Sequence, residues 1–362
     1  MKRRGFLGAC AAFGMLGGCR SAPRGRSARI RAAIEELNAQ IASGMIDGAV
    51  FGTTETPEIE AVGLRMKTPR PLPVEPDTRF DVASITKPAV AACAALLHAE
   101  GRLDPHAPFT RYLPEHVLGE RCDVTVMDLA THSSGFVTYV RFCGDDVAAF
   151  LKAVMAHRPD RPPRSIFHYN CYNYILLGMI VERISGVQLD RFARERLFAP
   201  LGMADSDWGP TTCGNVVAFP HALPGRPLTP PGRIVDQIAG SCAFPIGNAG
   251  LFTTARDQLL FAEDMLARRR FPKAYYDLLS TRAFSQGTDM RSFGWDMRPA
   301  GRPRNSSDAT IFHTGSTGQT IAIDPERGLA AVLLTVRRGG HNEAIVARRR
   351  VMDILFENQK KG

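Results

Sequence analysis

Ser84 and Lys87 are the residues of this chain whose types and spacing most directly suggest chemistry. A serine hydroxyl is a weak nucleophile until a neighbouring base takes its proton. Two residues that lie three apart on a helix share one face, so Lys87 can reach the Ser84 hydroxyl. The apolar residues around Lys87 should partly desolvate it and lower its pKa. The pair therefore predicts nucleophilic catalysis by Ser84 at a helix start, where backbone N–H groups favour a developing negative charge.

A Ser-x-x-Lys tetrapeptide is short enough to arise by chance, so its surroundings must decide. Residues 80–88 resemble the F-D-x-A-S-x-T-K stretch of the class C β-lactamase and penicillin-binding-protein family of serine hydrolases. Six further family-like blocks follow in the expected order, at 129–135, 172–178, 200–203, 248–255, 293–296 and 312–315. The resemblance runs from about residue 28 to the C-terminus. It departs at Ala83, where class C β-lactamases usually carry glycine.

The second motif of that family, Tyr-x-Asn, falls on Tyr169-Asn170-Cys171. By resemblance, Tyr169 would act as general base and return the proton to the leaving group, with its phenolate favoured by Lys87. A buried structural tyrosine is the alternative interpretation. Cys171 stands where the family has asparagine, and a thiol lacks the two donors and one acceptor of an amide. Recognition of a substrate amide is therefore in doubt.

The third motif falls on His313-Thr314-Gly315, where the family has Lys-Thr-Gly or His-Thr-Gly on a strand. The resemblance implies that Gly315 lets substrate approach the strand, and that the N–H groups of Ser84 and Ser316 form the oxyanion hole. His313 should titrate between about pH 5 and 8, so it would be mostly neutral at pH 7. This weakens β-lactams and D-Ala-D-Ala stems as favoured substrates; a satisfied core histidine is the other interpretation.

The elements that must position these residues follow from apolar spacing and turn residues. A helix should begin behind Ser27 and stop at Gly44, and a buried helix should run from about Ser84 to Glu100. Strands are expected at 48–54, 58–64, 309–313, 319–323 and 329–336, and further helices at 174–185, 187–197 and 342–358. Together with the resemblance, this predicts an α/β (α+β) fold of the β-lactamase/DD-peptidase type, with a largely antiparallel sheet flanked by helices. The mixed lobe would take residues of about 28–84 and 245–362, with a mainly helical lobe of about 85–244 inserted between them.

The N-terminus is typical of an export signal. Arg3-Arg4 and the residues after them resemble a twin-arginine signal, and residues 16–19, Leu-Gly-Gly-Cys, resemble a bacterial lipobox. Residues 1–18 would then be a signal peptide, Cys19 the lipidated first residue, and 19–27 a tether. This predicts a protein on the periplasmic side of a bacterial membrane, held there by its lipid. An ordinary secretory signal is the alternative.

Charge and composition limit the remaining partners. The chain of 362 residues has a formal net charge of +9, and two arginine clusters, at 268–270 and 348–350, are expected on solvated helix faces. No zinc spacing, phosphate loop or basic stripe with interleaved aromatics is present, so we expect no metal, no cofactor and no nucleic acid. The cysteines are not spaced as a disulfide scaffold.

These patterns predict an exported serine hydrolase that acts through an acyl-enzyme on an ester, amide or peptide bond. A cell-wall D-amino-acid linkage is one such bond, and the substrate is a small molecule or a peptide. Two alternatives stay open at this point: a true β-lactamase, and a catalytically silent protein that binds wall fragments.

Overall fold

A nine-stranded antiparallel sheet is the largest element of the computed structural model, which describes residues 27–119, 122–139, 146–219 and 229–357. The predicted signal, Cys19 and residues 19–26 of the tether lie outside these ranges. The strand order is β3-β2-β1-β12-β11-β10-β9-β8-β7. The strands are β1 (Ile46–Thr53), β2 (Glu60–Met66), β3 (Leu72–Pro73), β7 (Phe284–Gln286), β8 (Asp289–Ser292), β9 (Trp295–Asp296), β10 (Ile311–Thr314), β11 (Thr320–Asp324) and β12 (Leu329–Arg337).

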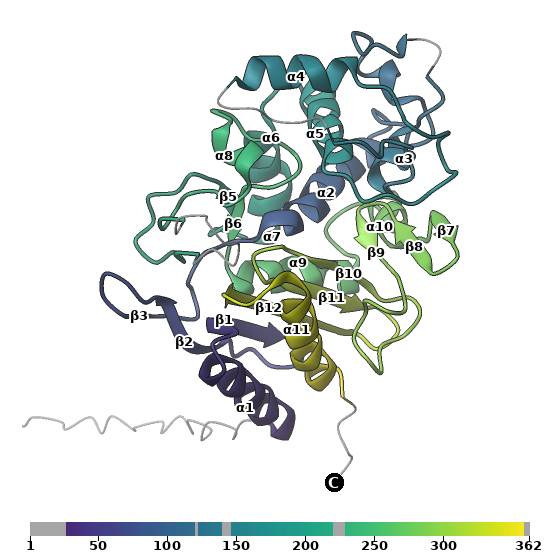
Figure 1. The fold of residues 1–362 in the computed structure, drawn as a ribbon. Coiled ribbons are helices and arrows are strands. Elements are labelled where there is room, and N and C mark those ends of the chain that lie inside the picture. The colour runs from purple at the N-terminus through teal and green to yellow at the C-terminus, as the bar shows by residue number, and fades with distance from the viewer. Residues whose placement is uncertain (1–26, 120–121, 140–145, 220–228, 358–362) are drawn as a thin grey trace, which may run out of the picture.

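Helices cover both faces of this sheet (Figure 1). α1 (Ala28–Ala42) and α11 (His341–Leu355) pack together over one face, and α9 (Ala255–Ala267) lies on the other face, against β1, β11 and β12. α1 begins where predicted, because the Ser27 hydroxyl accepts a hydrogen bond from the Ile30 N–H at 3.3 Å. Every residue of β1 is buried, so this central strand lacks the polar alternation of a strand with one solvated face.

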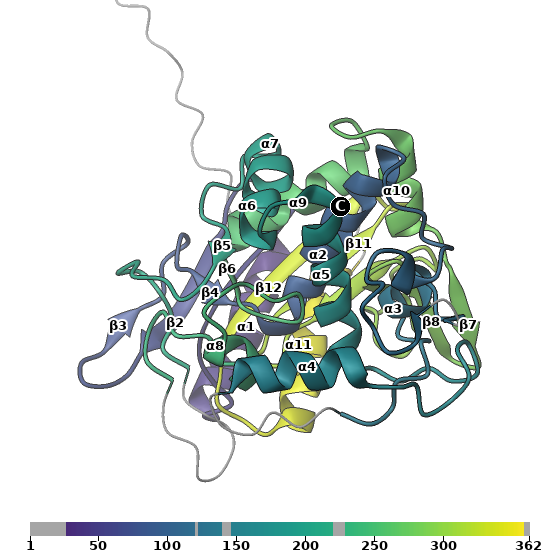
Figure 2. The ribbon, with the colours of Figure 1, turned by 90° about the horizontal axis from the view of Figure 1, so that it is seen from above.

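A mainly helical part is inserted between β4 and β6, the strands that lead into and out of it. α2 runs through its centre with every residue from Thr86 to Leu97 buried, and it packs against α5 and α10. Figure 2 shows α2 and α5 side by side. The remaining elements are α3 (Val126–Ala130), α4 (Val147–Ala156), α5 (Tyr172–Ser185), α6 (Leu189–Ala193), α7 (Ala199–Leu201), α8 (Gln237–Ser241), α10 (Lys273–Ser280) and a small sheet of β4 (Phe80–Asp81), β6 (Leu251–Thr253) and β5 (Asp207–Trp208).

The predicted fold class is confirmed, with one local difference at Ser84. The sequence predicts an α-helix from about Ser84, whereas Ser84 lies in a 3₁₀ turn, Ala83–Ile85, and the α-helix α2 begins at Thr86 and ends at Ala99. Within the described ranges, no helix is both long and apolar enough to cross a membrane. The five cysteines placed there, at 93, 122, 171, 213 and 242, all carry free thiols.

The packing of α1 on the sheet gives a stability prediction. Leu37 is fully buried in the cluster formed by α1, α11 and β1, with Phe51, Leu333 and Val351 among its members. Leu37→Ala should lower the free energy of unfolding by about 2–5 kcal/mol, because it leaves a cavity. Asn38→Ala, at the exposed neighbouring position, should change it by less than about 0.5 kcal/mol. Urea unfolding measures both; equal effects would contradict this packing.

Candidate active site

Ser84 and Lys87 meet where the 3₁₀ turn passes into α2. The Lys87 ammonium donates to Ser84 Oγ at 3.0 Å and to the carbonyl oxygen of Asn248 at 2.8 Å. Lys87 is fully buried, while Ser84 is half-buried. Since Lys87 donates to the serine oxygen, the Ser84 O–H hydrogen is free to point at a second acceptor.

The predicted lowering of the Lys87 pKa is wrong. Burial does disfavour the ammonium, but the interactions of Lys87 with Cys171 and Tyr169 outweigh burial and raise its pKa above the ordinary value. The sequence shows the apolar helix around Lys87 but not the polar groups that approach it from α5. Lys87 therefore holds a positive charge, and the acceptor for the serine proton must be another group.

Tyr169 is the group that best fits an acceptor for the Ser84 proton. It lines the same cavity as Ser84, and the Lys87 ammonium lies 5.1 Å from the centre of its ring. The ring of the buried His132 packs against it at 4.5 Å between centroids. His132 Nδ1 accepts the Asn170 N–H at 3.3 Å, which fixes the backbone directly after the tyrosine.

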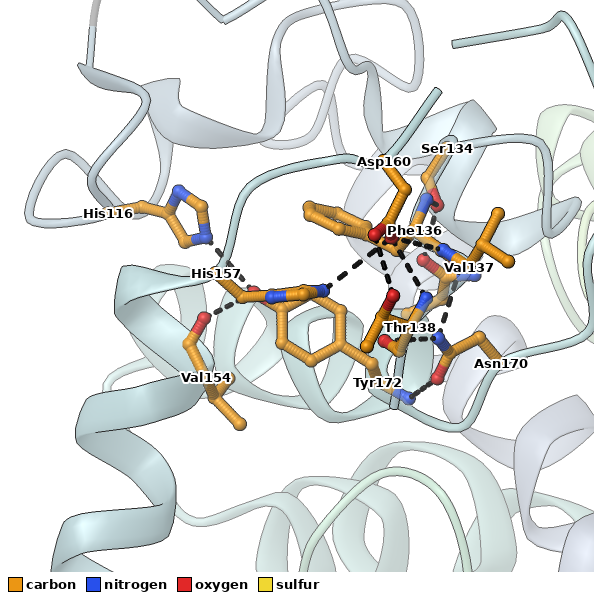
Figure 3. A network of polar contacts seen from close by, with 11 residues as sticks. His116, Ser134, Phe136, Val137, Thr138, Val154, His157, Asp160, Asn170 and Tyr172 are labelled. Carbon is orange, nitrogen blue, oxygen red and sulfur yellow. Dashed lines mark hydrogen bonds and ion pairs between the residues drawn. The ribbon is translucent and has the colours of Figure 1, made fainter. Parts of the chain in front are cut away.

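A polar network, buried around Asn170 and exposed around Asp160, holds this part of the chain (Figure 3). The Asn170 amide donates to the carbonyls of Phe136 and Thr138, and its oxygen accepts the Tyr172 N–H at 3.0 Å. The Asp160 carboxylate in turn holds the Thr138 end of that loop, by accepting from its N–H at 2.9 Å and its hydroxyl at 2.6 Å. Asn170 thus ties Tyr169 to a loop that is itself fixed, which gives it a structural role that the sequence motif does not reveal.

Cys171 lies at the N-terminal cap position of α5 and is half-buried. It is not among the residues that line the cavity, but its interaction with Lys87 raises the pKa of that lysine. Its predicted contact with substrate has no support in the cavity lining and stays a prediction.

The backbone before Ser84 is held in an unusual conformation. Ala83 has φ of 45°, in the left-handed region that glycine adopts without strain, and its N–H donates to Asp81 Oδ1 at 2.9 Å. The other Asp81 oxygen accepts the Val235 N–H at 2.7 Å. Burial raises the pKa of Asp81 to about 6, although both hydrogen bonds oppose the rise. The Ala83 departure from the family pattern therefore falls at a position that prefers glycine.

β10 carries the third motif into the cleft. His313, Thr314, Gly315 and Ser316 line a cavity of about 280 Å³ together with Ser84. The other lining residues are Phe167, Tyr169, Arg291, Asp296, Arg298, Ile345 and Arg348. The structure thus brings together most of the residues proposed from the sequence, and their catalytic roles follow as a proposal below.

The expectation that His313 titrates between about pH 5 and 8 is wrong. Burial, followed by the nearby charges of Lys87 and Arg291, lowers the pKa of His313 well below its ordinary value. Its Nδ1 lies 3.1 Å from the carbonyl oxygen of Thr314. His313 is therefore neutral across that range, and it supplies no charge to a substrate.

Gly315 has a packing role that the sequence did not predict. A Cβ at this position would lie 2.5 Å from the carbonyl oxygen of Val82 and 2.8 Å from Gln319 Oε1. The chain that leads to Ser84 takes up the space of a side chain here. Gly315 also lines the cavity, and its role in letting substrate approach the strand stays a prediction. The Thr317 hydroxyl joins the same two segments by donating to the Asp81 carbonyl at 2.9 Å. Glycine is required here so that the two segments can touch.

Arginines supply the charge that His313 lacks, and the sequence did not identify them. Arg291 is 4% exposed, pairs with Asp296 at 3.2 Å and lies 4.3 Å over the ring of Phe167. Arg348, expected on a solvated helix face, is only 7% exposed and lines the cavity. The signal that could have found it is its spacing on α11, where Ala344, Arg348 and Val351 share the buried side of the helix.

Among the described residues, no cluster of histidine, cysteine, aspartate and glutamate side chains has the arrangement of a metal site. The chemistry that can be derived from the placed groups is nucleophilic attack by a serine. A cation and a phenol stand beside that serine.

Comparison with known proteins identifies relatives of this chain. The chain is 30% identical to Esterase EstB of Burkholderia gladioli over 316 residues, which cover 73% of this chain and 78% of that relative. It is 26% identical to the "Putative D-alanyl-D-alanine carboxypeptidase" of Escherichia coli over 309 residues, 74% of this chain and 70% of that relative. A class C β-lactamase from Rhodobacter sphaeroides has the same fold, with a TM-score of 0.73 and 22% identity over 89% of this chain and 98% of that one. EstCE1, described as a hydrolase with promiscuous acyltransferase activity, gives a TM-score of 0.75 at 17% identity, covering 90% and 98%.

The Beta-lactamase family model matches residues 30–356, nearly the whole of the described chain. The curated relatives of this chain include an esterase and putative D-alanyl-D-alanine carboxypeptidases, which are named as enzymes and not as binding proteins. The chain belongs to the Beta-lactamase family and is a serine hydrolase.

Proposed function

We propose that Ser84 is the nucleophile, and that it attacks the carbonyl carbon of an ester or amide to form an acyl-enzyme that water then hydrolyses. The observation that carries this proposal is the hydrogen bond of 3.0 Å from the buried Lys87 ammonium to Ser84 Oγ, inside the cavity that Tyr169 also lines. A buried ammonium aimed at a serine oxygen favours the charge that this oxygen develops during attack.

The proton of Ser84 goes to Tyr169 in this mechanism. Lys87 cannot take it, because interactions with its neighbours keep the ammonium protonated. The same positive charge favours a phenolate at Tyr169. After the tetrahedral intermediate forms, Tyr169 donates the proton to the leaving group, and it activates the hydrolytic water in the second step.

The backbone N–H groups of Ser84 and Ser316 form the proposed oxyanion hole. Both residues line the cavity, and among the described residues neither N–H has a hydrogen-bond acceptor in the protein. Two free donors at the mouth of the cleft suit the negative oxygen of a tetrahedral intermediate.

An ester of a small molecule is the leading substrate, supported by the 30% identity to Esterase EstB. A cell-wall D-amino-acid linkage is the second candidate. The specific observation in its favour is the positive charge of the cleft, since Lys87, Arg291, Arg298 and Arg348 face only one cavity-lining carboxylate, Asp296. A free terminal carboxylate, which such peptides and many β-lactams carry, suits these arginines.

Replacement of the nucleophile tests the mechanism. Ser84→Ala should abolish covalent labelling by a fluorophosphonate and lower the hydrolysis of an activated ester by at least about 10³-fold, because only binding and the oxyanion hole remain. Ser133→Ala is the matched control, since this buried serine lies outside the cavity. Labelling of Ser84→Ala at the wild-type level would show that another serine is the nucleophile.

The neutral state of His313 predicts how binding depends on pH. A group with a lowered pKa keeps one charge state throughout the range above that pKa, so it contributes no pH dependence there. The ratio of Kd values for a carboxylate-bearing inhibitor and its methyl ester should therefore stay constant from about pH 5 to 8. His313→Gln should give the same flat profile. A wild-type preference for the carboxylate that grows as the pH falls would mean that His313 becomes charged.

We also propose that the protein is exported and held at the periplasmic side of a bacterial membrane by a lipid on Cys19. The support is the sequence of residues 1–19 alone. In bacterial cells, wild-type protein should begin at Cys19 and partition with membranes, and Cys19→Ser should be released or misprocessed. Cys213→Ser, distant in sequence from the signal, is the control. A soluble wild-type protein that begins at another residue would contradict the anchor.

A further inference from the structure

The peptide unit between Gly315 and Ser316 has two polar groups, the Gly315 carbonyl and the Ser316 N–H, and each has a role in the site. It is trans, so the Gly315 carbonyl and the Ser316 N–H point in opposite directions. Arg348 Nη1 donates to the Gly315 carbonyl oxygen at 2.6 Å, and the Gly318 N–H donates to it at 3.1 Å. The Ser316 N–H at the other end of the same peptide is the proposed oxyanion donor.

Arg348 and Arg337 hold the turn from Gly315 to Gln319 by donating hydrogen bonds to its backbone carbonyls. Arg348 Nη1 also donates to the Gln319 carbonyl at 3.2 Å, and Arg337 donates to the Ser316 carbonyl. The two bonds of Arg348 are buried, so the turn cannot rotate its peptide planes without breaking a charge-assisted hydrogen bond. These hydrogen bonds thereby fix the orientation of the Ser316 N–H.

The two arginines form an unusual pair. Among the described residues, neither Arg337 nor Arg348 forms a salt bridge with a carboxylate, and the buried Nε of Arg348 has no partner. Burial, followed by the charge of Arg337, lowers the pKa of Arg348 to about 10. Arg348 is buried and Arg337 is half-buried. A like charge beside a buried cation destabilises the fold, and such an arrangement is typical of functional sites.

We propose that Arg348 is a positioning residue of the oxyanion hole, which orients and polarises the Gly315–Ser316 peptide so that its N–H binds the tetrahedral intermediate. A cation bonded to a carbonyl oxygen draws electrons from the amide and strengthens the N–H as a donor. The effect acts on the transition state, because the full negative charge exists only there. The proposal rests on the proposed acyl-enzyme mechanism and adds a residue that does not touch the reacting atoms.

The test uses a neutral nitrophenyl ester, so that binding of a substrate carboxylate plays no part. Arg348→Gln should lower kcat by about 10-fold with KM within about twofold of wild type, since loss of a whole oxyanion donor costs about 10²–10³. The Kd of a neutral boronic acid, which forms a tetrahedral adduct with serine, should weaken by a similar factor. Arg350→Gln is the matched control, being an exposed arginine two residues along the same helix, and it should match wild type.

Two further variants separate positioning from folding. Arg348→Ala should regain kcat when methylguanidinium is added at millimolar concentration, which a merely structural defect would not do. If circular dichroism shows that Arg348→Gln does not fold, Arg348→Lys, which keeps the buried charge but offers a single donor nitrogen, should show the same fall in kcat at constant KM.

A rise in KM with unchanged kcat, or no change in either, would overturn the role of Arg348. The absence of rescue by methylguanidinium would also contradict it. These results leave the acyl-enzyme mechanism standing as long as Ser84→Ala abolishes labelling. Persistent labelling of Ser84→Ala is the separate result that would remove the mechanism itself.

Discussion

The buried ammonium of Lys87 is the interaction on which the rest of the site depends. An unpaired charge in a protein interior is very unfavourable, so Lys87 needs polar partners on every side from which water is excluded. It finds them in Ser84 Oγ, in the carbonyl of Asn248 and in the polar groups of Tyr169 and Cys171. These partners come from three segments that are far apart in the sequence. The charge therefore forces the turn before α2, the start of α5 and the loop before β6 to converge on one point.

The small sheet and the loop of residues 234–236 show how this convergence is made rigid. Asp236 caps α8 and accepts from the Asn248 amide at 3.2 Å, while the neighbouring Val235 N–H bonds to Asp81. One partly buried network thus holds Asn248, whose carbonyl accepts from the Lys87 ammonium, and Asp81, whose carboxylate accepts from the Ala83 N–H. A left-handed conformation at a residue with a Cβ costs about 1–2 kcal/mol and persists only where its surroundings enforce it. Here the enforcing bond is that of the Ala83 N–H to Asp81.

The sequence predicted many of the long elements, because their apolar spacing extends over many residues, but it gave no range for α4 or α9. α1, α5, α11 and the strands β1, β10, β11 and β12 lie close to their predicted ranges. The strands β7, β8 and β9 and the small sheet were not predicted, because two to four residues are too few to show a period. Within the site, motif spacing predicted which residues gather, but not their ionisation. The pKa directions of Lys87 and His313 depend on neighbours from other segments, and no local pattern reports those.

Gly315 shows the same limit for a single residue. Motif resemblance identified the glycine, and the structure adds that a side chain here would collide with the Val82 carbonyl. Val82 precedes the turn of Ser84, so this contact sets the separation of the two N–H groups proposed as the oxyanion hole. A change that enlarged residue 315 would thus push apart two donors that must converge on one oxygen.

The distribution of charge explains why a neutral histidine is tolerated at the position where the family also uses lysine. Lys87 and Arg291 already lower the pKa of His313, so a permanent cation at this buried position would add repulsion. Positive charge is instead supplied from the walls, by Arg291 on β8 and by Arg348 on α11. Each of these guanidinium groups is anchored, the first by Asp296 and the second by backbone carbonyls. A substrate anion would then be held at the sides of the cleft, while the strand beside Ser84 keeps a neutral side chain. The position of the charge, more than its presence, would therefore determine where a carboxylate lies relative to the bond that Ser84 is proposed to attack.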